Sequence, residues 1–97
     1  MKYRFHPEAE IELTEAALYY DGVAAGLGSE FLDEVGAAIH RILDFPNAWT
    51  PLSSRIRRCL LNRFPYGIIY QIRDDHIQIV AVNHLHRAPN YWRNRLE

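Results

Sequence analysis

The chain has 97 residues, of which 48% are hydrophobic and 24% are charged, and its formal net charge is −1. This length and composition indicate one folded domain over residues 1–97 and exclude the disordered and collagen-like classes. No apolar run approaches the roughly 18 residues of a membrane span, and the first residues lack the apolar core of a signal peptide. We therefore expect a cytoplasmic protein that does not contact a membrane.

The charge is divided unevenly along the chain. Residues 1–54 hold three bases and nine acids, a net charge of −6, whereas residues 55–97 hold eight arginines and three acids, a net charge of +5. Ten of the eleven bases are arginine, whose planar guanidinium suits two-point contacts with carboxylate or phosphate. The second half is therefore expected to face an anionic or acidic partner.

The first elements predicted are a short strand and two helices. Residues 2–6 alternate as in a strand, and Pro7 suits the first position of a helix because it lacks an amide donor. Two apolar stripes with helical spacing follow, separated by glycines, and they predict an antiparallel helical hairpin. The first stripe contains Ala9, Leu13, Ala16, Ala17, Tyr20 and Ala24, and the second contains Phe31, Leu32, Val35, Ala38, Ile39, Ile42 and Leu43. We interpret Glu8, Glu10 and Glu12 as charges favoured by the helix dipole.

Three strands are predicted after a loop over residues 45–54. They cover residues 57–64, 66–73 and 76–83, with turns at Pro65 and at Asp74-Asp75, and Cys59 is expected to be a small buried hydrophobe within them. Pro89 is expected to open a short final helix through Leu96. The predicted class is α+β: a short amino-terminal strand, an antiparallel helical hairpin packed on a small, mostly antiparallel sheet, and a short carboxy-terminal helix.

Two histidines follow the last predicted strand. His84 and His86 are two residues apart and would share one face of a strand, but no third metal ligand lies near them in sequence. The chain also lacks a glycine-rich phosphate loop, a serine nucleophile elbow and a CxxC motif. We therefore expect no metal and no cofactor, with His84 fixing the strand end and His86 partly exposed.

The residues after these histidines alternate arginine with aromatic rings. Arg87, Tyr91, Arg93 and Arg95 have the composition that suits phosphates and bases, and an acidic peptide equally well. Trp92 is expected to pack on the body of the domain. Metal-free RNA cleavage would need a base, a cation for the phosphate and an acid. His84 or His86, Arg63 or Arg87, and Tyr91 are candidates for these three roles.

Several segments together resemble a known family. The short strand, the hairpin with Tyr19-Tyr20 near the end of its first helix, the segment Arg63-Phe64-Pro65-Tyr66-Gly67-Ile68-Ile69-Tyr70 and the ending His84-Leu85-His86-Arg87-Ala88-Pro89-Asn90-Tyr91-Trp92 are similar to the RelE/ParE toxin superfamily. This resemblance implies the toxin of a bacterial type II toxin–antitoxin pair that a small antitoxin neutralises, in a possible hetero-oligomer. RelE-like members cleave mRNA on the ribosome, whereas ParE-like members inhibit DNA gyrase.

The sequence favours the ParE-like branch. Nuclease members generally carry a basic residue where this chain has Gly67, after Tyr66, and they are strongly basic, whereas this chain totals −1. If the chain is a nuclease, its catalytic residues are Arg87, His84 and Tyr91. The expected target-binding residues are Arg63, His86, Arg87, Tyr91, Arg93 and Arg95. Ile11 and Leu18, off the main core face of the first helix, are candidates for antitoxin contact; inward packing against the second helix is the equal alternative.

Overall fold

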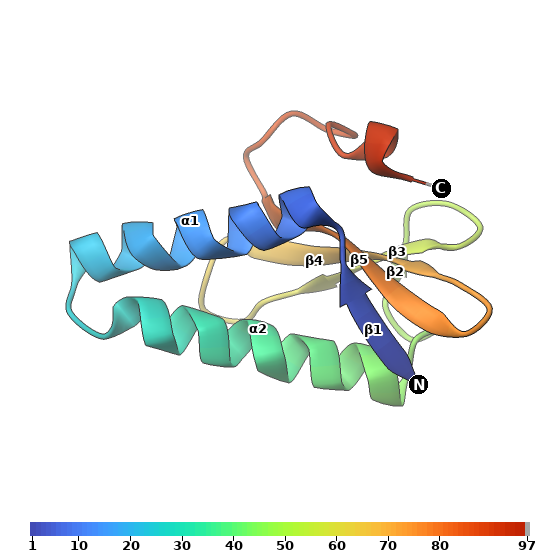
Figure 1. The fold of residues 1–97 in the computed structure, drawn as a ribbon, viewed down its shortest axis with the longest axis horizontal. Coiled ribbons are helices and arrows are strands. Elements are labelled where there is room, and N and C mark those ends of the chain that lie inside the picture. The colour runs from blue at the N-terminus through green and yellow to red at the C-terminus, as the bar shows by residue number, and fades with distance from the viewer. Residues whose placement is uncertain (97) are drawn as a thin grey trace.

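The predicted strand, helical hairpin and three further strands are all present in the structure, a computed structural model that describes residues 1–96 (Figure 1). Two helices and one five-stranded sheet confirm the α+β class. The elements are β1 (Lys2–Phe5), α1 (Pro7–Val23), α2 (Leu27–Asp44), β2 (Thr50–Pro51), β3 (Ile56–Leu60), β4 (Tyr66–Ile72), β5 (His76–His84) and η1 (Arg93–Arg95). Within residues 1–96, no helix has the length and apolar character that crossing a membrane requires.

Local chemistry sets the ends of the two helices. His6 caps α1, because its Nδ1 accepts the backbone N–H of Glu8 at 3.1 Å, and Pro7 occupies the first helical position. A tight turn joins α1 to α2 through Gly26, whose φ of 84° is the left-handed region that glycine adopts without strain. Gly28 then lets the helices approach closely: a Cβ there would lie 2.3 Å from the carbonyl oxygen of Ala17.

The sheet has the strand order β1-β5-β4-β3-β2. The first strand pairs with β5 in parallel, and the other neighbours are antiparallel. The predicted loop over residues 45–54 was wrong in one part, because Thr50 and Pro51 pair with β3 as a short edge strand. The predicted strand 57–64 was too long: Glu34 Oε1 accepts the N–H groups of Asn62 and Arg63, which takes the chain out of the ladder after Leu60.

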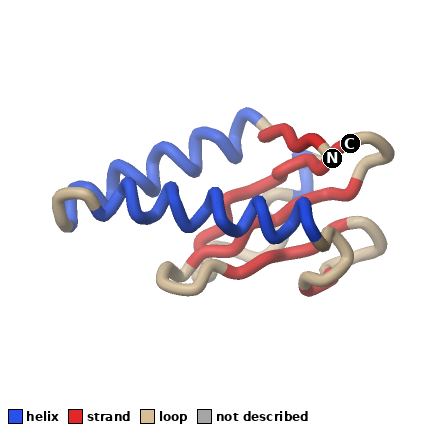
Figure 2. Tube along the Cα trace, turned by 90° about the horizontal axis from the view of Figure 1, so that it is seen from below, coloured by secondary structure: helices blue, strands red, loops and turns tan. Residues whose placement is uncertain are grey.

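The main core lies between the helical hairpin and one face of the sheet, and Figure 2 shows both helices on the same side of the strands. Phe31, Ile42, Ile68, Tyr70 and Ile79 are fully buried in it. Of the second predicted stripe, Leu32 differs, because 43% of its surface is exposed. Cys59 is fully buried, as expected, and burial raises the pKa of its thiol.

The segment after β5 covers part of the other face of the sheet. Trp92 is 3% exposed and packs in a second cluster with Ile56, Ile69, Val80 and Ala81, which confirms its predicted contact with the domain body. The predicted helix over residues 89–96 was wrong. Only Arg93–Arg95 forms a 3-10 turn, since the chain bends at Asn90, whose φ is 62°, and long-range contacts then fix the segment.

Candidate functional site

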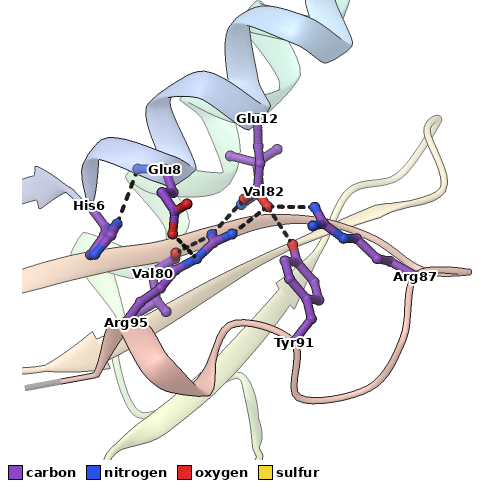
Figure 3. Close-up of polar contacts among 8 residues, drawn as sticks. All are labelled: His6, Glu8, Glu12, Val80, Val82, Arg87, Tyr91 and Arg95. Atoms are coloured by element: carbon purple, nitrogen blue, oxygen red, sulfur yellow. Dashed lines mark hydrogen bonds and ion pairs between the residues drawn. The ribbon is translucent and has the colours of Figure 1, made fainter.

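One carboxylate of α1 organises the end of the chain. Glu12 lies one helical turn from both Ala9 and Ala16, the buried positions by which α1 rests on the core. These small side chains let the helix approach β5 closely, and the side chain of Glu12 is only 10% exposed. In Figure 3, Arg87, Tyr91 and Arg95 converge on this carboxylate from the carboxy-terminal segment.

The contacts of Glu12 use both of its oxygens. Oε1 accepts the backbone N–H of Val82 and Nη1 of Arg95, each at 3.0 Å. Oε2 accepts Nη1 of Arg87 at 3.0 Å, the hydroxyl of Tyr91 at 2.8 Å and Nη2 of Arg95 at 3.0 Å. A buried charge is tolerated when it is paired and hydrogen-bonded, and Glu12 meets both conditions.

These side chains also complete the outer edge of β5. The parallel partner strand β1 pairs only as far as Phe5 with Ile79, so within residues 1–96 the next part of β5 has no strand beside it on that edge. The N–H of Val82 is taken up by Glu12, and the carbonyl of Val80 accepts Nη1 of Arg95 at 3.0 Å. The cluster therefore satisfies backbone groups that a sixth strand would otherwise pair.

The site shifts the ionisation of two of its members. Burial, together with the hydrogen bond to the Glu12 carboxylate, raises the pKa of Tyr91 to about 12. Burial alone would lower the pKa of Arg95, but the hydrogen bonds and charge of Glu12 outweigh it, and the pKa of this guanidinium is raised. Arg95 also forms an ion pair with Glu8 at 3.3 Å. At neutral pH the tyrosine is therefore a hydrogen-bond donor and the arginine a fixed cation.

The residues expected to contact a target fall into two groups. Tyr91 and Arg95 face Glu12. Arg95 was predicted to contact a target, but its side chain is only 6% exposed and its guanidinium is not presented to solvent. His86 and Arg93 are exposed, and the side chain of Arg87 is 52% exposed although it pairs with Glu12. We use the name terminal patch for these three exposed residues of the carboxy-terminal segment, His86, Arg87 and Arg93.

The remaining target residue, Arg63, lies apart from the terminal patch in the sequence, in the turn between β3 and β4. Its guanidinium pairs with Glu30 of α2 at 2.9 Å, and both side chains are more than half exposed. An ion pair with this much solvent contributes little to stability, and it leaves the arginine able to exchange partners. Arg63 therefore remains accessible to a partner.

The candidate catalytic residues are only partly brought together. His84 and Arg87 line one hollow of about 190 Å³ beside α1, which Tyr19 and Tyr66 also line. Tyr91 does not line that hollow, and its hydroxyl points to Glu12. Nδ1 of His84 accepts the N–H of His86 at 3.1 Å, consistent with its predicted role of fixing the strand end. Among residues 1–96, no group of three or more metal-ligating side chains is placed to hold a metal ion.

The candidate antitoxin-binding residues lie on the outside of α1. Ile11 is 54% exposed and Leu18 is 66% exposed, so neither packs inward against the second helix. Leu18 lines a hollow of about 270 Å³ between α1 and α2, which Leu13, Ala17 and Leu32 also line. We call this the hairpin groove. Its lining is largely apolar and includes the acidic Asp21, whose Oδ1 accepts the backbone N–H of Gly28.

Sequence reasoning missed the role of Glu12. The signal was present, because Glu12 is three residues after Ala9 and four before Ala16, and both alanines were assigned to the inner stripe of α1. A carboxylate at that position must find partners inside the fold. The helix-dipole interpretation applies to Glu8 and Glu10, which lie in the first turn.

The fold is shared with a known small α+β protein. A chain of the solved structure titled "Chromosomal ParDE TA system from P. aeruginosa" superposes with a TM-score of 0.65 over 89% of this chain and 97% of its own length, at 14% identity. Sequence similarity identifies the family more specifically than the fold does. The chain is 36% identical over 91 residues to "Toxin ParE2" from two strains of Mycobacterium tuberculosis, CDC 1551 / Oshkosh and H37Rv, which covers 90% of this chain and 84% of each relative.

A family model described as "ParE toxin of type II toxin-antitoxin system, parDE" matches residues 3–89. The chain therefore belongs to the ParE toxin family of type II toxin–antitoxin systems, within the RelE/ParE superfamily that its strand segment and ending resembled. The match ends at Pro89, so most of the carboxy-terminal segment held by Glu12 lies beyond the matched residues.

Proposed function

We propose that this ParE-family toxin inhibits growth by binding DNA gyrase, and that a cognate antitoxin neutralises it. The observation that carries binding over RNA cleavage is the engagement of Glu12 by Tyr91 and Arg87. A general acid must be directed at its leaving group, whereas the hydroxyl of Tyr91 is directed at a buried carboxylate and its pKa is raised to about 12.

The charge of the chain supports the same choice. A nuclease that docks on ribosomal RNA must neutralise many phosphates, which this chain with a net charge of −1 is poorly equipped to do. Gly67 follows Tyr66 in the middle strand, where a nuclease of the superfamily would carry a basic residue, and the space above it is taken by the stem of Arg58. A protein target needs only a local patch of matched charge and shape.

We place the target contact on the terminal patch together with Arg63. His86, Arg87 and Arg93 are held on a segment that Glu12 and Trp92 fix to the body, which limits the entropy lost on binding. In this proposal Tyr91 and Arg95 support the patch from within. Exposed arginine at the surface of a rigid segment is typical of residues that contribute strongly to protein–protein binding.

We place the antitoxin on the hairpin groove. Ile11 and Leu18 are seven residues apart, so they lie on the same side of α1, and both are more than half exposed. An amphipathic segment that docks an apolar side chain beside Leu18 in the groove and continues along α1 would also cover Ile11, which lies outside the groove. The acidic residues of the hairpin, Asp21 among them, would favour basic flanks on that segment.

The experiment that tests this function is a supercoiling assay with purified protein, gyrase and relaxed plasmid, with and without the co-encoded antitoxin. We expect inhibition by the toxin alone and recovery when the antitoxin is added in equal amount. A parallel translation reaction monitors the integrity of mRNA. Unchanged supercoiling at excess toxin, together with ribosome-dependent mRNA cleavage that Arg87→Ala abolishes, would replace the proposal with the RelE-like ribonuclease.

A further inference from the structure

A second hollow lies on the face of the sheet that the helices do not cover. It has a volume of about 290 Å³ and is bounded by β3, the end of β5 and the carboxy-terminal segment. Ile69 and Trp92 form part of its apolar lining, and Arg58, Asn83 and Arg87 supply polar groups. None of the residues that line it is acidic. We call it the sheet hollow.

Arg58 is held in the sheet hollow by the residue beneath it. It pairs with Ile69 across β3 and β4, and its side chain crosses Gly67, where a Cβ would lie 2.9 Å from both Cγ and Cδ of the arginine. Only glycine leaves that path open. Among residues 1–96, the buried Nε of Arg58 has no hydrogen-bond partner, which is unusual for a buried donor. The hollow is therefore lined by an arginine whose stem is held over Gly67 and whose Nε–H is buried without a protein partner in the described part of the chain.

Two further groups complete the polar wall. Asn83 is only 8% exposed and stands opposite Gly67 in the β4–β5 register, so its side chain lies on the same face as Arg58. Arg87 is held on the other side by Glu12 and by the ring of Tyr91, 3.8 Å from its guanidinium carbon. Basic and amide side chains around an apolar floor form a site for an anionic group that also carries carbon atoms.

We propose that the sheet hollow binds a carboxylate side chain presented by a segment of a protein partner. One carboxylate matches a hollow lined by two arginines, of which Arg87 already pairs with Glu12, and the methylenes of a glutamate would rest on Ile69. A nucleic-acid strand would need a series of cations that this chain does not gather. The inference rests on the proposed function only in taking the partner to be a protein.

The test is an NMR titration of the isotope-labelled full chain, observing the Arg58 Nε–H and the Asn83 side-chain amide. The probes are acetyl-Leu-Glu-Leu-amide, acetyl-Leu-Gln-Leu-amide, inorganic phosphate and adenosine monophosphate. We expect saturable shifts of both signals with the glutamate peptide, and at least about tenfold weaker binding of the glutamine peptide, because it cannot form the charge-assisted pair. No gyrase is present, so failure of the gyrase proposal leaves this result unaffected.

Variants distinguish binding in the sheet hollow from a general effect of the protein's charge. Arg58→Gln and Gly67→Ala should each weaken the glutamate peptide about tenfold or more, the second by displacing the arginine with an added Cβ. Arg55→Gln is the matched control, because Arg55 is half exposed, pairs with Asp74 and lies outside the hollow. The backbone amide spectrum verifies that each variant is folded.

Three results would overturn the proposal. The first is an Arg58 Nε–H signal that the glutamate peptide leaves unmoved at about 10 mM, a concentration at which a site with a Kd of about 1 mM would be mostly occupied. The second is equal binding of the glutamine peptide, which would make the hollow an apolar site. The third is tighter binding of phosphate or adenosine monophosphate than of the peptide, which would reassign the hollow to a phosphorylated ligand.

Discussion

The guanidinium of Arg95 meets the carboxylate of Glu12 in a two-point pair, with Nη1–Oε1 and Nη2–Oε2 distances both of 3.0 Å. The two residues are 83 positions apart, and their side chains are 6% and 10% exposed. Because both charges are shielded from water, they need compensation, which this pair supplies together with Glu8 for Arg95 and Arg87 for Glu12. The position of the carboxy-terminal segment therefore depends on one residue of the first helix.

Replacing Glu12 by Gln should destabilise the protein strongly. The neutral amide cannot compensate the buried guanidinium of Arg95, and removing one partner of a buried ion pair typically costs about 3–5 kcal/mol. Urea unfolding followed by circular dichroism measures the loss. Glu15→Gln is the matched control, since Glu15 is exposed on the same helix and should change the free energy of unfolding by less than about 0.5 kcal/mol. Equal unfolding midpoints for the two variants would contradict the proposed role of Glu12.

Removing the hydroxyl of Tyr91 should change how the free energy of unfolding depends on pH in the alkaline range. The pKa of Tyr91 rises to about 12 in the folded protein, above its ordinary value of 10, so the folded state favours the neutral phenol. This contribution is fully present below pH 10 and is lost as the pH rises through 12. Tyr70, whose pKa burial also raises to about 12, adds to the same fall.

The measurement is the urea midpoint of wild type and Tyr91→Phe at intervals from pH 9 to 12. We expect the variant to be less stable at pH 9 by about 1–2 kcal/mol, because the hydrogen bond to Glu12 is lost. Its decline above pH 10 should be shallower than that of wild type. Tyr3→Phe, at an exposed position of β1, serves as the control and should follow the wild-type curve. Parallel curves for wild type and Tyr91→Phe would exclude the assigned pKa.

The elements that sequence predicted well are those whose signal is local. The helical hairpin follows from apolar spacing in the sequence, and the three antiparallel strands follow from β-branched and aromatic runs closed by turns. The exposure of Ile11 and Leu18 was left open, because a helix face of that width could pack either way. In the structure both side chains face solvent, with 54% and 66% of their surfaces exposed.

The elements that sequence missed depend on contacts between distant residues. Residues 89–96 have a proline start and adequate helix formers, but burial of Trp92 and the pairing of Arg95 with Glu12 select a turn with Asn90 at positive φ instead. The short strand at Thr50–Pro51 exists only because β3 offers an edge. Local propensity contains no information on these distant contacts. The sequence could therefore predict which residues belong to the terminal patch, but not how they are arranged.

Adding a methyl group at Gly28 should weaken the helical hairpin. A Cβ there would lie 2.3 Å from the carbonyl oxygen of Ala17 and 2.7 Å from Cγ of Asp21, so the helices must separate. We expect Gly28→Ala to cost about 1–3 kcal/mol, as overpacked sites do. Gly36→Ala, also within α2, meets nothing within 4 Å and should instead gain about 0.5–1 kcal/mol from the better helix former. Chemical unfolding of both variants tests the pair, and similar midpoints would argue against close helix packing.

Reversing one charge of the terminal patch should reduce gyrase inhibition without affecting the fold. Arg93 is exposed, and its guanidinium carbon lies 5.2 Å from the ring centre of Trp92, so it is presented on a fixed support. We expect Arg93→Glu to raise the concentration that inhibits supercoiling by about tenfold or more. Lys2→Glu makes the same change of charge at an exposed position of β1 and should leave inhibition unchanged. Equal losses in both variants would point to net charge instead of a contact surface.

Placing a charge in the hairpin groove should release the toxin from its antitoxin. Leu18 is 66% exposed and lines the groove, so Leu18→Asp should leave the fold intact. An apolar antitoxin side chain docked there would lose its contact with Leu18, and its binding would have to remove water from the new carboxylate. We expect affinity for the co-encoded antitoxin, measured by calorimetry, to fall at least about tenfold, with gyrase inhibition retained. Val23→Asp is the matched control, since Val23 is 60% exposed on the same helix but does not line the groove. Unchanged antitoxin affinity in Leu18→Asp would move the antitoxin to another face, and the exposed apolar positions of α1 would then need a different partner.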